Sequence, residues 1–145
     1  MYSEILFPTD GGPASQAALS HAIDLAEQYD ARLHAVYVVD TIAYTAVDAG
    51  SETVLSALRQ EGETALEAVA ETTRDAEIPV TSEIVSGSPY KQILTYADDN
   101  EIDLIVMGTH GRTGLDRYLL GSVTERVVRT AAVPVLTVRA PEDEE

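Results

Sequence analysis

The sequence predicts a single α/β domain of the Rossmann-like class, with a doubly wound, five-stranded parallel sheet and helices on both faces. Short apolar, β-branched runs alternate with stretches of helical periodicity, which is typical of repeated strand–helix–strand units. The 145 residues allow one hydrophobic core and leave no room for a second domain. We expect the domain to cover residues 1–140 and an acidic tail to cover residues 141–145.

The first strand and the first helix are predicted at the start of the chain. Glu4 to Pro8 is typical of a strand, which must stop at Pro8 because proline cannot donate to the interior of a ladder. A turn follows at residues 9–12, and Pro13 suits the first position of a helix. Small and apolar residues then recur at helical spacing, so this helix can lie close to a sheet. The predicted buried stripe is Ala14, Ala18, Ala22, Leu25 and Tyr29.

The second strand and the second helix flank a segment without a clear period. Arg32 to Val39 is apolar on both alternating faces, so we expect it to be covered on both sides. Residues 41–50 show no period, and a helix is predicted from about Glu52 to Ala76. Gly62 lies within that helix, where glycine costs about 1 kcal/mol relative to alanine.

Prolines and glycines delimit the elements of the second half. Pro79 precedes the third strand, and Ser88 and Pro89 suit the N-cap and the first residue of a helix. Gly108 ends the fourth strand, which is an apolar β-branched run. The predicted elements are a strand at Val80–Val85, a helix from Pro89 to about Tyr96, a strand at Asp103–Met107, a helix at Val123–Thr130 and a strand at Pro134–Arg139.

The connection between the fourth strand and the last helix is unusually long. Such connections usually take about 2 to 6 residues, and this one takes roughly twice as many. Ser122, with a glutamate three residues later, matches a capping box, so a helix should begin near Val123 with free amide groups directed toward the loop. Gly108, Gly111 and Gly121 would let a phosphate approach these amides, although glycines that merely form turns are the alternative.

These residues carry a resemblance to a known family. With Gly108-x2-Gly111-x9-Gly121-Ser122 and Phe7-Pro8-Thr9-Asp10-Gly11, nearly the whole chain resembles the universal stress protein family in its ATP-binding branch. The resemblance implies the strand order 3-2-1-4-5, in which the first and fourth strands are neighbours and their following loops face each other. One departure is Gly12, where the family commonly has serine, which puts a hydroxyl contribution from this position in doubt.

The resemblance also implies ATP as the ligand and a set of binding residues. Asp10 resembles the family's aspartate near the ribose and the phosphate-bound metal, although an aspartate that bonds only its own turn is the alternative. Val38 corresponds to a strand position whose backbone contacts the adenine. Arg112 is the nearest fixed positive charge to the expected phosphates, and the neighbouring His110 could equally bond the backbone. The implied binding residues are Pro8, Thr9, Asp10, Val38, Met107, Gly108, His110, Gly111, Arg112, Gly121, Ser122, Val123 and Thr124.

The sequence favours a nucleotide-dependent stress-response protein over an enzyme, and no catalytic residue is predicted. Ser122, His110 and Asp10 could be drawn as a hydrolase triad, but the G-x-S-x-G motif is absent. No lysine follows a glycine as a P-loop requires. Magnesium is expected on the nucleotide phosphates, with no dedicated protein site. Hydrolysis should be slow or absent, and two alternatives stay open: an interaction module that binds no nucleotide, and a slow ATPase.

The acidic composition limits the choice of partners. The chain has 25 acidic against 9 basic residues, of which Lys91 is the only lysine, and a formal net charge of −16. Such a charge opposes the phosphate backbone, so nucleic acid is not expected as a partner. Molar salt shortens the screening length from about 8 Å to about 3 Å and relieves the self-repulsion. The composition therefore favours a protein from a halophile, with an ordinary acidic protein as the alternative.

The sequence also predicts where the protein is located and how it assembles. The chain has no cysteine, no basic and apolar segment typical of a secretory signal at its start, and no apolar run of the roughly 18 to 20 residues that a membrane span needs. We therefore expect a cytoplasmic protein without a membrane partner. His21 and His34 have no acidic or histidine neighbours at ligand spacing and are expected to be structural. The last strand, Pro134–Arg139, would form the edge of the sheet, and the resemblance implies a homodimer through it unless a loop covers that edge.

Overall fold

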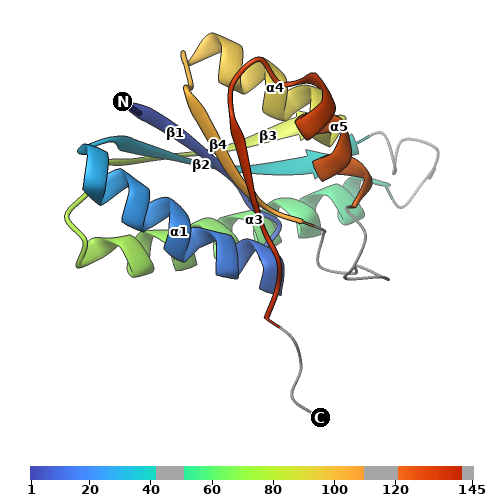
Figure 1. Cartoon of the computed structure of the whole chain (residues 1–145). Helices are drawn as coiled ribbons and strands as arrows, with labels where there is room; N and C mark the ends of the chain where they lie inside the picture. Colours follow the sequence, from blue (N-terminus) through green and yellow to red (C-terminus); the bar gives the residue numbers. More distant parts are fainter. Residues whose placement is uncertain (42–50, 110–120, 142–145) are drawn as a thin grey trace.

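The computed structural model describes residues 1–41, 51–109 and 121–141 and contains nine helices and strands in these ranges. Strands and helices alternate along the chain, as the sequence predicts (Figure 1). Within these ranges, no helix is long and apolar enough to cross a membrane. The elements are β1 (Glu4–Pro8), α1 (Pro13–Tyr29), β2 (Arg32–Asp40), α3 (Ser51–Arg74), β3 (Val80–Gly87), α4 (Pro89–Asp99), β4 (Leu104–Gly108), α5 (Ser122–Thr130) and β5 (Val135–Val138).

The strands form one parallel sheet in the order β3-β2-β1-β4-β5. The predicted fold class and strand order are therefore confirmed. The register pairs Ile5 with Leu33 on one side of β1 and with Leu104 on the other side. As a result, the carboxyl ends of β1 and β4 lie next to each other at one edge of the sheet.

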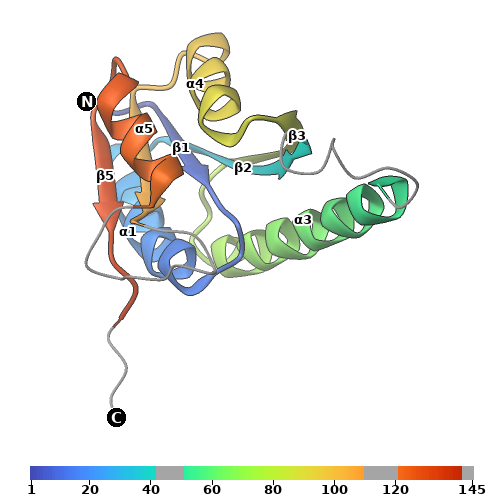
Figure 2. The ribbon, with the colours of Figure 1, turned by 90° about the vertical axis from the view of Figure 1, so that its right-hand side faces the viewer.

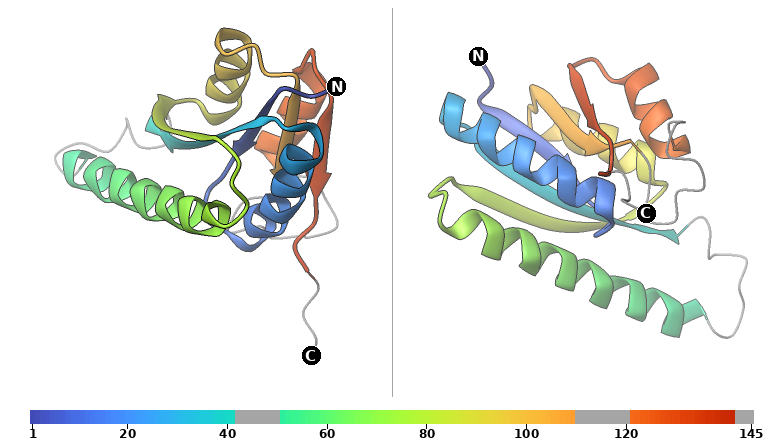
Figure 3. Two further views of the ribbon diagram at one scale, coloured as in Figure 1. Left: turned by 90° about the vertical axis from the view of Figure 1, so that its left-hand side faces the viewer. Right: turned by 60° about the horizontal axis from the view of Figure 1, so that its bottom comes forward.

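Two pairs of helices cover the two faces of this sheet (Figures 2 and 3). Residues of α1 and α3 share one hydrophobic core cluster with one face of β1 and β2. Residues of α4 and α5 share the second cluster with the other face. Because both faces are covered, every residue of β4 is buried, whereas the edge strands β3 and β5 are only partly buried.

Helix α1 lies close to the sheet because its inner side consists of small residues. Ala14, Ala18 and Ala22 are buried as predicted, and Ala26 extends the stripe. The prediction that Tyr29 belongs to it is wrong, because this side chain is 41% exposed and packs edge-on against the ring of Tyr2. The helix ends in a left-handed residue, Asp30, whose amide group returns to the carbonyl groups of Ala26 and Glu27.

The structure explains why helix α3 contains a glycine. A Cβ atom on Gly62 would lie 2.7 Å from Cδ1 of Tyr37, and Tyr37 is itself buried in the core under α3. Glycine therefore allows this turn of α3 to approach the ring of Tyr37 more closely than any other residue could. Glycine at this position lowers the helix propensity of α3, as the sequence predicts, but it permits a close packing contact between α3 and β2.

Element boundaries differ from the predictions by a few residues. Helix α4 continues three residues beyond the predicted end and stops at Asp99. Strand β3 continues to Gly87, because its residues remain paired with β2 as far as Asp40. Apart from Pro141, the predicted acidic tail lies outside the described residues.

Candidate functional site at the carboxyl edge of the sheet

The candidate site begins where β1 and β4 end side by side. Leu6 is paired with Ile105, so the segment that follows Pro8 and the segment that follows Gly108 leave the sheet at the same edge. This is the position at which doubly wound sheets bind ligands, because the chain turns in opposite directions after the two strands. The two segments that the sequence singles out are therefore neighbours in space.

Asp10 is tied to the first turn of α1. Its Oδ1 atom accepts hydrogen bonds from the amide group of Gly12 at 2.8 Å and from the hydroxyl group of Ser15 at 3.0 Å. The amide group of Asp10 in turn donates to Oγ of Ser15 at 3.3 Å. The aspartate thus bonds its own turn, and these contacts fix the carboxylate at the end of β1. Ser15, which orients it, carries no signal in the sequence.

Gly108 is required by packing at the point where β4 ends. A Cβ atom on Gly108 would lie 2.7 Å from Cβ of Ala14, 2.8 Å from its carbonyl carbon and 3.0 Å from the amide nitrogen of Ser15. The end of β4 therefore presses against the first turn of α1, the same turn that holds Asp10. A residue with a side chain at position 108 would push these two segments apart.

Thr124 connects α5 to the end of β4. Its hydroxyl group donates to the carbonyl oxygen of Gly108 at 2.9 Å, and the side chain is only 3% exposed. This hydroxyl group faces the protein interior, so any contact of Thr124 with a ligand would have to come from its backbone. The bond fixes the start of α5 against β4.

The start of α5 differs from the prediction by one residue. The N-cap is Gly121 rather than Ser122, and no side chain caps the helix, so the predicted capping box is wrong. Glu125 pairs with Arg129 at 2.8 Å instead of reaching back to the cap. The amide group of Gly121 donates to the carbonyl oxygen of Thr109 at 2.7 Å, which closes the long loop at its base.

Three amide groups at the start of α5 lack a carbonyl partner within the helix. The first intrahelical bond runs from Glu125 to the carbonyl oxygen of Gly121, so helix geometry leaves the amide groups of Ser122, Val123 and Thr124 without such a partner. Ser122 is exposed. This first turn therefore offers hydrogen-bond donors and the positive end of the helix dipole to an anion.

The other predicted residues have different surroundings. Pro8, Thr9 and Met107 are buried, and the amide group of Thr9 donates to the carbonyl oxygen of Val36, which continues the β1–β2 ladder beyond Pro8. Met107, Val38 and Val123 belong to the core cluster on the side of α4 and α5. The predicted residues outside the described part of the chain are His110, Gly111 and Arg112.

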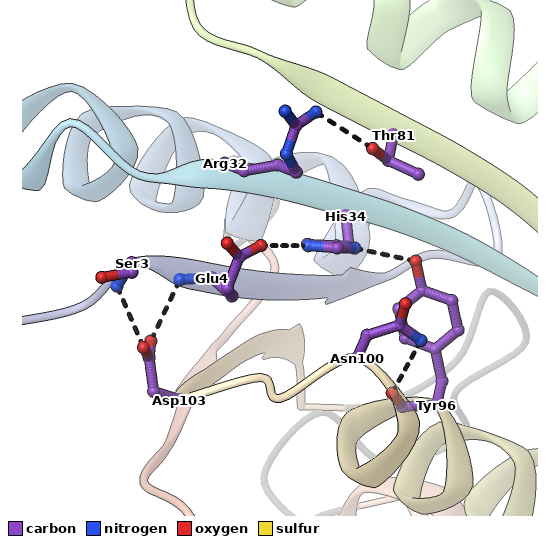
Figure 4. A network of polar contacts seen from close by, with 8 residues as sticks. All are labelled: Ser3, Glu4, Arg32, His34, Thr81, Tyr96, Asn100 and Asp103. Atoms are coloured by element: carbon purple, nitrogen blue, oxygen red, sulfur yellow. Dashed lines mark hydrogen bonds and ion pairs between the residues drawn. The ribbon is translucent and has the colours of Figure 1, made fainter.

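A second polar cluster lies at the opposite edge of the sheet (Figure 4). The buried His34 of β2 has its Nε2 atom 2.6 Å from Oε1 of Glu4 and its Nδ1 atom 2.8 Å from the hydroxyl group of Tyr96. Asp103 accepts hydrogen bonds from the amide groups of Ser3 and Glu4. The structural role expected for His34 fits this geometry, but its acidic partner is 30 residues away in sequence and was not predicted.

The phenol of Tyr96 in this second cluster is kept in its neutral form. Burial raises the pKa of the Tyr96 hydroxyl group above its usual value, and the carboxylates of Glu83 and Glu4 raise it further. A raised pKa keeps the phenol protonated, so it serves as a hydrogen-bond donor rather than as a nucleophile. The cluster joins β1, β2 and α4 and is a structural element of the amino edge.

No dedicated metal site is formed by the described residues. Among them, no group of three or more histidine and acidic side chains is placed to hold a metal ion. Asp10 provides a carboxylate close to the first turn of α1, while the first turn of α5 provides amide donors. The carboxyl edge therefore combines amide donors, which suit an anion, with the carboxylate of Asp10.

Comparison with known proteins identifies the family. The profile of the universal stress protein family matches residues 1–139. A universal stress protein of Methanocaldococcus jannaschii is 42% identical over 146 residues, which cover 99% of this chain and 86% of the relative. The solved structure of the protein MJ0577 from the same organism superposes with a TM-score of 0.87 at 31% identity, covering 99% of both chains.

More distant solved structures share the fold and contain nucleotides. One is a universal stress protein in complex with cAMP, with a TM-score of 0.75 and 23% identity over 97% of this chain and 99% of that one. Another is an Arabidopsis thaliana family protein with AMP bound, with a TM-score of 0.70 and 16% identity over 94% and 90% of the two chains. The family profile and the relative with 42% identity carry the assignment. The chain belongs to the universal stress protein family.

Proposed function

We propose that this protein binds ATP at the carboxyl edge of the sheet and acts as a nucleotide-dependent stress-response protein. The observation that carries the proposal is the pairing of β1 with β4, which brings the turn of Asp10 next to the loop that leads into α5. A polyphosphate needs amide donors and a positive dipole end, and the first turn of α5 supplies both. The amide groups of Ser122, Val123 and Thr124 would bind the phosphates.

The remaining contacts follow from the elements that meet at this edge. Met107 and Val38 are apolar residues near the ends of β4 and β2 and would contact the base, with the backbone of Val38 reading its edge. Asp10, which lies at the end of β1, would contact the ribose or a magnesium ion held mainly by the phosphates. His110, Gly111 and Arg112 stay predictions from the sequence.

The packing around Gly108 supports the binding of a nucleotide. This residue is in van der Waals contact with α1, so β4 and the first turn of α1 close one wall of the site without side chains between them. The hydroxyl group of Thr124 locks α5 onto the same strand end, which holds its amide donors in place. A rigid wall and fixed donors favour binding, because few protein groups lose conformational entropy when the ligand binds.

The proposal favours binding without efficient turnover. A general base must lie within hydrogen-bond reach of the attacking water, and Oδ1 of Asp10 is already occupied by Gly12 and Ser15. The solved family structures with cAMP and AMP show that other chains of this fold hold adenine nucleotides. In this chain, the residues at the ends of β1 and β4 would provide the nucleotide contacts.

Calorimetric titration with ATP and magnesium, followed by a phosphate-release assay on the same sample, tests the proposal. Saturable binding without steady release of phosphate is the expected result. Absence of binding would instead favour an interaction module, and steady release would favour a slow ATPase. Titration with GTP as a control reports whether the base is recognised.

We also propose a homodimer through β5. The strand lies at the edge of the sheet, and Leu136 on it is 37% exposed, while Val128 on the adjacent α5 is 45% exposed. An unpaired apolar edge strand is a template for pairing, and a two-fold axis would pair β5 with its copy. Light scattering on the protein and on Leu136→Lys tests this: the variant should be monomeric, and a dimeric variant would contradict the proposal.

The composition leads to a further proposal, adaptation to high salt. With a formal net charge of −16, self-repulsion should weaken the folded state in dilute buffer and be screened by molar KCl. Urea unfolding in dilute and in molar KCl should show higher stability in the concentrated salt. Equal stability in both would contradict halophily. A cytoplasmic location and a domain limit at residue 140 stay predictions from the sequence.

A further inference from the structure

Ser15 contacts Asp10 from the first turn of α1. Its hydroxyl group donates a hydrogen bond to Oδ1 of Asp10 at 3.0 Å and accepts one from the amide group of the same residue at 3.3 Å. A hydroxyl group has one donor and two acceptor sites, so both bonds can form at once. One serine hydroxyl group therefore holds both the backbone and the carboxylate of Asp10.

Ser15 is enclosed by the protein. The residue is 5% exposed, and its amide nitrogen would lie 3.0 Å from a Cβ atom on Gly108. It therefore lies between the turn that follows β1 and the end of β4, which together form the candidate site. Asp10 is more exposed than Ser15. A buried hydroxyl group in this place acts on a ligand through Asp10 rather than by direct contact.

The turn between β1 and α1 is also closed by bonds that do not involve Ser15. The amide group of Gly11 donates to Oγ1 of Thr9 at 3.0 Å, and the amide group of Gly12 donates to Oδ1 of Asp10 at 2.8 Å. Gly11 has φ +80°, a left-handed conformation that favours glycine. Removal of the Ser15 hydroxyl group should therefore loosen the carboxylate of Asp10 while the turn itself is retained.

From this geometry we propose that Ser15 is a positioning residue of the nucleotide site. It holds the carboxylate of Asp10 in the orientation that contacts the ribose hydroxyl groups or the phosphate-bound magnesium ion. This inference rests on the proposed binding of ATP. A carboxylate that is already oriented loses less conformational entropy when the ligand binds, so removal of the Ser15 hydroxyl group should weaken binding about 2- to 10-fold.

A double-mutant cycle with Asp10 tests this role. Calorimetry measures the affinity for ATP with magnesium in the wild type, Ser15→Ala, Asp10→Ala and the double variant. Ser15→Ala should weaken binding about 2- to 10-fold in the wild type, but by less than about 1.5-fold in the Asp10→Ala background. This dependence on Asp10 separates positioning from a general loosening of α1, which would weaken binding equally in both backgrounds.

Ser20→Ala is the matched control on the same helix. Ser20 is exposed, and its hydroxyl group donates to the carbonyl oxygen of Ala17 at 3.1 Å. The change therefore removes a serine hydroxyl group from α1 without removing a contact to Asp10. The affinity of Ser20→Ala for ATP should equal that of the wild type, and urea unfolding of each variant checks that it is folded.

Two further titrations identify the ligand group that Asp10 contacts. If it is the magnesium ion, the difference between the wild type and Ser15→Ala should disappear when EDTA replaces magnesium. If it is the ribose, the difference should disappear with 2′,3′-dideoxy-ATP. A difference that persists under both conditions would overturn the proposal, because neither group would then depend on the position of the carboxylate.

Two results of the cycle would also overturn it. One is undiminished affinity in Ser15→Ala, and the other is an equal loss in the presence and absence of the Asp10 carboxylate. Either result, in a wild-type protein that binds ATP, refutes the role of Ser15 and leaves the proposed function intact. A wild-type protein that does not bind ATP would refute the proposed function and this inference with it.

Discussion

Replacing Ser122 by proline removes one amide donor from the proposed phosphate site while preserving the helix. Ser122 is the first residue of α5, where proline is favoured because the amide group there has no intrahelical partner. The preceding residue, Gly121, has φ −66° and ψ 161°, which is the extended conformation that a following proline requires. Ser122 is exposed, so the change fills no cavity and removes no packing contact.

The expected loss of affinity follows from the chemistry of the removed bond. A hydrogen bond from an amide group to a charged phosphate is worth about 1.5 to 3 kcal/mol. Ser122→Pro should therefore weaken ATP binding about 10- to 150-fold. The free energy of unfolding should change by no more than about 0.5 kcal/mol, because the substitution lies on the surface at a position that accepts proline.

Calorimetric titration of ATP into three proteins measures this effect. Ser122→Ala is the control, because it removes the hydroxyl group and retains the amide group. The wild type and Ser122→Ala should bind alike, and Ser122→Pro should bind much more weakly. Undiminished affinity in Ser122→Pro would refute the role of the first turn of α5, and equal losses in both variants would assign the effect to the hydroxyl group.

Three further predictions concern stability. Gly62→Ala should lower the free energy of unfolding by about 1 kcal/mol, because the overlap with the buried Tyr37 ring outweighs the gain in helix propensity, and urea unfolding that shows stabilisation would contradict this. Thr124→Val should lower the free energy of unfolding by about 1 to 3 kcal/mol in the same assay, since it leaves the carbonyl oxygen of Gly108 without its donor. An unchanged midpoint of urea unfolding would show that this hydrogen bond contributes little to stability. Because burial raises the pKa of Tyr96 above 10.0, its contribution to stability is complete below that pH and is lost as the pH rises from 10.0 through the higher folded value. The free energy of unfolding should therefore fall above pH 10.0; Tyr96→Phe should show a shallower fall, and identical slopes would contradict the assignment.

The sequence is sufficient for the fold because its elements are marked locally. Prolines and glycines delimit the strands, as at Pro8 and Gly108, and the apolar runs between them have strand length. The alanine stripe of α1 has helical period, so its buried face was predictable except at the end, where Tyr29 packs on Tyr2 instead of the core. The alternation of strands and helices predicts a parallel sheet, and the family resemblance supplies the strand order. Together they predict that β1 and β4 are neighbours.

Contacts between distant residues could not be predicted in the same way. His34 meets Glu4 across 30 residues and Tyr96 across 62, and neither spacing is a signal in a single sequence. The cap of α5 was misassigned for a different reason. Gly121 and Ser122 are both acceptable N-caps, and the glutamate that suggested a capping box forms a surface pair with Arg129 instead.

Gly108 shows how packing and binding can require the same residue. The sequence pattern favours Gly108 as part of a phosphate loop, yet its missing Cβ is already required by the 2.7 Å approach to Ala14. A glycine at this position would therefore be needed even in a family member that binds no nucleotide, and substituting it would lower stability and affinity together. The amide groups at the start of α5 carry no such packing constraint, because Ser122 is exposed. The nucleotide proposal accordingly depends on the first turn of α5, where a proline separates loss of binding from loss of folding.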